Sequence, residues 1–118
     1  MNNTQIGKIG EEISVRYLIR NGWLILERNT KMRNLELDIL GEKLGERVLF
    51  EIKTVAREMI GQDDISREIF FGSERFGINK HENMKILGQG KGVDRVCLLC
   101  VALSLQDRKA FIREMSAL

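Results

Sequence analysis

Leu35-Glu36-Leu37-Asp38-Ile39-Leu40 and, after a short turn, Arg47-Val48-Leu49-Phe50-Glu51-Ile52-Lys53 are the two stretches that decide the fold. Apolar residues recur at every second position in both, which predicts two β-strands because successive strand side chains point to opposite faces. The segment Gly41–Gly45 between them begins and ends with glycine and predicts the turn of an antiparallel hairpin. The hairpin would place Asp38 beside the triplet Glu51-Ile52-Lys53.

Two carboxylates beside a lysine suit the hydrolysis of phosphodiesters with a divalent metal. The reaction needs an activated water, stabilisation of negative charge and help for the departing oxygen, and carboxylate-held Mg²⁺ supplies much of all three. Asp38 and Glu51 are the predicted ligands of Mg²⁺ or Mn²⁺, with the Ile52 carbonyl as a third. Lys53 is predicted to orient the attacking water or to neutralise developing charge.

The same hairpin also has a simpler interpretation. An antiparallel pair with one face in water shows this alternation, and a glutamate near a lysine is an ordinary surface pair. Composition and spacing alone favour this solvated face over a metal site.

The segment before the hairpin, Thr4 to Asn21, has helical periodicity and ends at the stop signal Asn21-Gly22. At about 100° per residue, Glu11 lies at the edge of the apolar stripe and is predicted to be half-buried. Glu12 is predicted to be in water. The predicted stripe consists of Ile6, Ile9, Ile13 and Tyr17.

The remaining elements follow in order along the chain. They are a strand at Trp23–Asn29, a polar connection at Thr30–Asn34, a long excursion at Thr54–Phe76, a helix at Ile78–Leu87, a strand at Asp94–Leu103, and an edge strand or short helix at Lys109–Met115. Helix, three strands, helix and one or two strands predict a single α/β domain, residues 1–118, built on a mixed sheet.

Length and composition set the class of protein. The 118 residues suffice for one compact domain, and 43% hydrophobic with 31% charged residues is typical of a globular chain. A formal net charge of +2 is too small to indicate nucleic-acid binding by bulk charge. The sequence has no apolar run of about 20 residues and no signal-peptide pattern, so we expect a cytoplasmic protein without membrane contact.

The cysteines of Cys97-Leu98-Leu99-Cys100 invite a zinc interpretation, which their context does not favour. They lie in an apolar strand, where residues three apart face opposite sides, and the sequence offers one histidine, His81. Both are predicted to be small buried hydrophobes.

A family resemblance adds to this reading. The chain resembles the opening of the YraN-like proteins (UPF0102), which reads roughly G-x-x-G-E, Y-L, G-aromatic, I-L and N. Glu36-Leu37-Asp38-Ile39 is similar to that family's G-E-I-D-L/I segment, and Phe50–Thr54 to its F-V-E-V-K-T-R. The residues matching the opening are Gly7, Gly10, Glu11, Tyr17, Leu18, Gly22, Trp23, Ile25, Leu26 and Asn29.

The family is assigned to the restriction-endonuclease-like PD-(D/E)xK superfamily, which includes Holliday-junction resolvases. The resemblance implies a mixed sheet flanked by helices with an αβββαβ core. It puts Asp38, Glu51 and Lys53 at the signature positions and makes Glu11 the helix acid, which would complete the metal shell or bind water beside it. The chain departs from the family at Val55, where the arginine after Thr54 is missing, and this weakens the expected phosphate contact. A second departure is Leu35 in place of glycine.

Together these observations predict a Mg²⁺- or Mn²⁺-dependent DNA endonuclease acting on structured or branched DNA, and the superfamily suggests a homodimer. Lys80 and Lys91 are candidate contacts to DNA. Two alternatives remain open: a non-catalytic nucleic-acid-binding module that retains the nuclease fold, and a protein-interaction domain with an acidic face.

Overall fold

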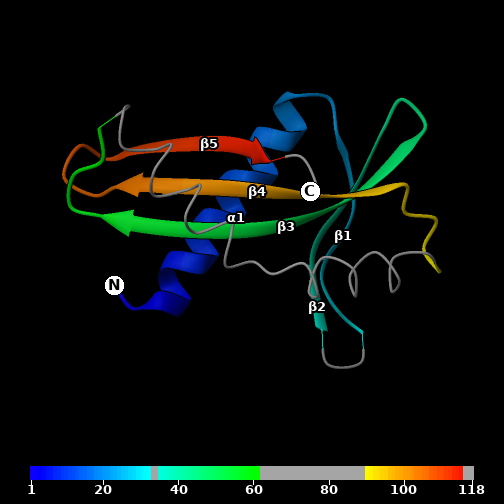
Figure 1. The fold of residues 1–118 in the computed structure, drawn as a ribbon, viewed down its shortest axis with the longest axis horizontal. Helices are drawn as coiled ribbons and strands as arrows, with labels where there is room; N and C mark the ends of the chain where they lie inside the picture. The colour runs from blue at the N-terminus through cyan, green and yellow to red at the C-terminus, as the bar shows by residue number, and fades with distance from the viewer. Residues whose placement is uncertain (33–34, 62–89, 116–118) are drawn as a thin grey trace.

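The computed structural model describes residues 1–32, 35–61 and 90–115. These ranges contain one helix and one five-stranded sheet with strand order β1-β2-β3-β4-β5 (Figure 1). The pair β3–β4 is parallel and the other neighbours are antiparallel, so the sheet is mixed. The elements are α1 (Asn3–Arg20), β1 (Leu24–Met32), β2 (Leu35–Lys43), β3 (Glu46–Arg57), β4 (Arg95–Ser104) and β5 (Lys109–Met115).

This architecture confirms the predicted fold class, an α/β domain built on a mixed sheet. The segment Lys109–Met115, left open between strand and helix, is a strand. The predicted helix at Ile78–Leu87 lies outside the described residues. Within the described part of the chain, no helix has both the length and the apolar character that a membrane crossing requires.

The sheet divides where β2 separates from β3. The two strands pair from the turn only as far as Ile39 and Phe50. Before that point β2 pairs with β1 alone, and beyond it β3 continues beside β4 as far as Arg57. Figure 1 shows the β1–β2 arm turning away from the β3–β4–β5 arm. We call this divergence the fork.

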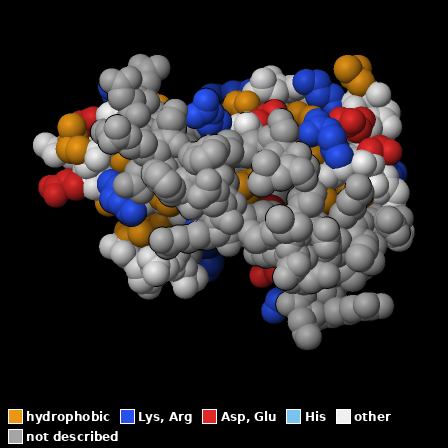
Figure 2. Space-filling model, viewed as in Figure 1, with side chains coloured by type: hydrophobic (Ala, Val, Ile, Leu, Met, Phe, Trp, Pro, Cys, Tyr) orange, Lys and Arg blue, Asp and Glu red, His pale blue; other side chains and the backbone are white. Residues whose placement is uncertain are grey.

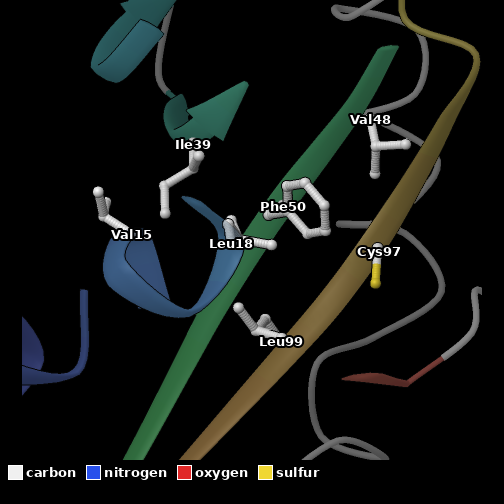
Figure 3. Close-up of a cluster of buried hydrophobic side chains, with 7 residues drawn as sticks. All are labelled: Val15, Leu18, Ile39, Val48, Phe50, Cys97 and Leu99. Carbon is white, nitrogen blue, oxygen red and sulfur yellow. The ribbon is translucent and has the colours of Figure 1, made fainter. Parts of the chain in front are cut away.

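Helix α1 covers the face of the sheet that carries Val48 and Phe50. Figure 3 shows Leu18 beside the Phe50 ring and the Leu99 side chain of β4. Each fully buried aliphatic or aromatic side chain of this kind stabilises the fold by about 1.5–3 kcal/mol. The cluster fixes the helix, and with it Glu11, against β3.

The buried face of α1 differs from the predicted stripe. Ile9 is 37% exposed, and the buried helix residues are Gly10, Ser14, Val15 and Leu18. Small residues replace large ones because the helix lies very close to β3: a Cβ added at Gly10 would collide with the Thr54 side chain. Of the predicted stripe, Tyr17 packs against the core and Ile6 and Ile13 are half-buried, so the prediction was wrong for Ile9 and missed the small buried residues.

Two strand predictions also need correction. The excursion does not begin at Thr54, because β3 continues to Arg57 in parallel register with β4. Leu37 and Ile39, expected on one face, belong to different clusters, Leu37 with Leu49 and Ile39 with the helix-facing core.

The cysteines behave as predicted. Cys97 and Cys100 are free and buried, and they lie in hydrophobic clusters on opposite faces of β4. Burial raises the pKa of the Cys100 thiol to about 11, which leaves it protonated at neutral pH.

The close approach of α1 to β3 predicts that Gly10→Ala is destabilising although alanine is the better helix former. The collision with Thr54 should lower the free energy of unfolding by about 1–3 kcal/mol, measured by urea denaturation. Adding Thr54→Ala should recover part of the loss. A Gly10→Ala variant as stable as the parent would contradict the packing described for this helix.

Candidate functional site

Asp38 lies at the fork, where its side chain accepts a hydrogen bond in place of a backbone carbonyl. Continuing the β2–β3 register would pair Asp38 with Glu51, but the strands have already separated. Instead, Asp38 Oδ2 accepts a hydrogen bond of 2.9 Å from the Ile52 backbone N–H. A carboxylate therefore satisfies a donor that would otherwise lose its ladder partner.

Asp38 and Glu51 form a close acid pair at this point. Glu51 is 7% exposed, and its side chain is hydrogen-bonded to that of Asp38. Burial, followed by repulsion from the Glu51 carboxylate, raises the pKa of Asp38 to about 7. At neutral pH Asp38 thus retains part of its proton, and a divalent cation would relieve the same repulsion.

Past the fork, no strand of the described residues pairs with the β2 side of β3, and we call this side the open edge of β3. Ile52 N–H points to the β2 side, and in a strand the carbonyl of a residue projects to the same side as its N–H. The Ile52 carbonyl, predicted as a metal ligand, is therefore directed toward the Asp38 side. By the same alternation the N–H and carbonyl groups of Thr54 and Ala56 face this edge.

Glu11 reaches the site from α1. Its side chain is 17% exposed, and burial together with the Asp38 charge raises its pKa, against the lowering effect of Asn29 and Arg28. Glu11 Oε1 is buried and accepts no hydrogen bond from the described residues, and the nearest Arg28 nitrogen lies at 3.7 Å. Glu12 is exposed, as predicted, and accepts a 2.7 Å hydrogen bond from Arg28.

Asn29 is a site residue whose role the sequence reasoning missed. Its φ of 52° is left-handed, a conformation that asparagine tolerates better than most residues. The β1–β2 register, Arg28 with Ile39 and Thr30 with Leu37, puts Asn29 opposite Asp38. Its side chain is hydrogen-bonded to Glu11, so Asn29 connects the helix acid with the fork. The sequence offered one indication, because asparagine is uncommon within a strand and tolerates a left-handed φ.

Glu11, Asp38 and Ile52 line one cleft of about 590 Å³ between α1 and β3. Lys53 is exposed and lines the cleft together with Asp38, Glu11 and the exposed Glu36. The structure therefore brings Glu11, Asp38, Ile52 and Lys53 to one place. Among the described residues, no group of three or more His, Cys, Asp or Glu side chains is arranged to hold a metal ion.

Lys91 has a partner within the chain. Its Nζ lies 2.9 Å from both carboxylate oxygens of Glu27, and its carbonyl accepts a 3.0 Å hydrogen bond from Arg47. These contacts fix the loop before β4 to β1 and β3. Lys80, the other candidate DNA contact, lies outside the described residues. Acidic and basic side chains are intermixed on the face drawn in Figure 2, in keeping with such local pairs.

The raised pKa of Asp38 predicts that the metal-free protein loses stability as pH rises. Between pH 3.8 and about 7 the folded state binds more protons than the unfolded chain. The contribution of Asp38 to the free energy of unfolding therefore falls as the pH rises through this window. Asp38→Asn should remove this loss and be more stable than the parent by about 2–4 kcal/mol at pH 8, with little difference at pH 4. Urea denaturation in EDTA at both pH values measures the effect. The exposed turn variant Asp107→Asn is the control, and an equal pH response in all three proteins would refute the prediction.

The Asn29 geometry predicts that its backbone and side chain can be separated. Asn29→Gly should change stability little, because glycine adopts left-handed φ freely. It should nevertheless raise the pKa of Glu11 further, because the hydrogen bond that lowers it is lost. Carboxyl-detected NMR titration follows Glu11 directly. If the titration midpoint of Glu11 is unchanged in Asn29→Gly, the asparagine is needed only for its left-handed backbone conformation and not for a hydrogen bond to Glu11.

Comparisons with known proteins agree with the family resemblance. Curated relatives, each described as a UPF0102 protein, cover about half of this chain. The protein from Dictyoglomus thermophilum is 43% identical over 54 residues, covering 46% of each chain. That from Bacteroides thetaiotaomicron is 37% identical over 62 residues, 52% of this chain and 51% of the relative. The chain thus spans about half the length of the curated relatives it matches.

A structural comparison finds Pyrococcus furiosus SfsA in complex with Ca²⁺, at a TM-score of 0.40 and 16% identity, covering 98% of this chain and 64% of that one. The model of the family described as "Uncharacterised protein family UPF0102" matches residues 10–70, just over half of the chain. This range contains Glu11, Asn29, Asp38, Glu51 and Lys53. The chain therefore belongs to the family UPF0102.

Proposed function

We propose that this protein is a Mg²⁺- or Mn²⁺-dependent DNA endonuclease that hydrolyses phosphodiesters in structured or branched DNA. The observation that carries the proposal is the acid pair at the fork, which the half-buried Asp38 and the buried Glu51 form next to the exposed Lys53. A buried pair of acids is unfavourable unless a proton or a cation is present. A divalent cation bound between the two acids would offset their repulsion, and this supports a metal-dependent function.

The donor set fits a hard divalent cation. Asp38 and Glu51 would hold the ion, with the Ile52 carbonyl directed to the same side. Mg²⁺ keeps several of its waters, so two carboxylates and one carbonyl suffice on the protein side. When bound, the cation would supply Lewis acidity for phosphodiester hydrolysis.

The surrounding residues have separate roles in this proposal. Glu11 Oε1, buried and without a hydrogen bond from the described residues, would accept one from a water at the site. Lys53 would neutralise charge developing on the phosphate. Asn29 would keep Glu11 in position beside Asp38.

Val55 favours a second candidate, a nucleic-acid-binding module without catalysis. Valine lines the cleft at the position where the YraN-like family has arginine, so a phosphate contact is missing. Such a module would bind DNA with an affinity that depends steeply on salt concentration, and it would not cleave DNA whichever metal is added. The interaction-domain alternative predicts neither metal nor DNA binding.

A cleavage screen separates these functions. Linear, supercoiled, flap and four-way-junction DNA are incubated with the protein and Mg²⁺ or Mn²⁺, and Mn²⁺ binding is measured in parallel by electron paramagnetic resonance. Lys53→Ala should keep Mn²⁺ binding but lose cleavage by about a hundredfold or more. Asp38→Asn should lose both. Lys109→Ala, an exposed lysine on β5, is the matched control. Absence of Mn²⁺ binding at millimolar concentration would rule out the nuclease.

A further inference from the structure

Gly7 is a glycine in the interior of α1 that packing within the described residues does not require. It is exposed, and a Cβ placed on it would meet no described atom within 4 Å. Gly10 is the contrast, because there the added Cβ collides with Thr54. Glycine in a helix interior is less favourable than alanine. Its presence at position 7 thus needs a reason outside the contacts of this helix.

The position of Gly7 supplies one. Gly7 lines the cleft that contains Asp38 and Lys53, and Glu11 lies one helical turn further along the same face of α1. At Gly7 the helical wall of the cleft has no side chain, so its backbone can be approached closely. A bulky group entering the cleft would make contact with α1 there.

Charge indicates what such a group is. Lys8 and Lys53 are exposed, both line the cleft, and neither forms an ion pair with another described residue. Thr54 and Ala56 of β3 also line the cleft, and the Ala56 carbonyl accepts a 2.9 Å hydrogen bond from Arg57. Two cations without an ion-pair partner among the described residues suit a polyanion with a narrow backbone.

We propose that the sugar–phosphate backbone of the DNA substrate packs directly against α1 at Gly7, with Lys8 contacting a phosphate. This inference rests on the proposed function and names a contact surface separate from the acid pair. The surface is defined by Gly7 and Lys8 on α1. It makes glycine at position 7 a requirement of binding and not of folding.

The test uses variants whose stability and binding should move in opposite directions. Gly7→Ala and Gly7→Leu should raise the melting temperature by a few degrees, because both residues favour helix more than glycine does. Their affinity for a four-way junction and for linear duplex, measured by fluorescence anisotropy in Ca²⁺, should fall, with at least a tenfold loss for leucine. Mn²⁺ binding should stay unchanged.

A charge-matched pair tests the lysine. Lys8→Ala should weaken DNA binding several-fold. It should also reduce the slope of log affinity against log salt concentration by about 1, because one fewer counterion is released. Arg16→Ala removes the same charge from an exposed position of α1 that does not line the cleft and should have little effect.

The outcomes distinguish this inference from the proposed function. A parent chain that cleaves DNA while Gly7→Leu binds DNA equally well would overturn the inference alone. A lower melting temperature for Gly7→Ala would also overturn it, because glycine would then serve packing. A parent chain that binds Mn²⁺ but no DNA would overturn both.

Discussion

The hydrogen bond from the Ile52 N–H to Asp38 Oδ2 is the constraint on which the rest of the site depends. Separating two paired strands leaves backbone donors and acceptors without partners, at a penalty comparable to a lost hydrogen bond. Asp38 removes this penalty at the first unpaired donor, so β2 can leave β3. The same separation opens the edge of β3 and creates the cleft. An apolar residue at position 38 would leave the donor unsatisfied.

Helix α1 provides the second condition. Its small residues Gly10 and Ser14 let the helix lie close to β3. This close approach places Glu11 near the fork. Four acids, Glu11, Glu36, Asp38 and Glu51, then influence one another, and the raised pKa values of Glu11 and Asp38 record this crowding together with burial. The arrangement is unfavourable for the isolated protein, and acids with raised pKa values of this kind are common at functional sites.

Sequence alone predicted the parts of this structure that depend on local pattern. Alternation identified β2 and β3 and brought Asp38 to Glu51, since strand direction fixes where side chains point. The fork was not predictable, because it depends on one side chain replacing a backbone partner from another strand. The helix face was predicted only in part, because close approach to β3 selects small residues such as Gly10, whereas the apolar pattern included the exposed Ile9. The role of Asn29 depends on a left-handed φ and on a register that only the fold defines.

The central claim is that the half-buried Asp38 and the buried Glu51 form an acid pair that a divalent cation stabilises. The most direct measurement is a carboxyl-detected NMR titration of Asp38 from pH 4 to 9, with and without Mg²⁺. The account predicts a midpoint near 7 without metal and a markedly lower midpoint with Mg²⁺, because the cation competes with the proton. A midpoint near the ordinary 3.8 that Mg²⁺ does not move would contradict it.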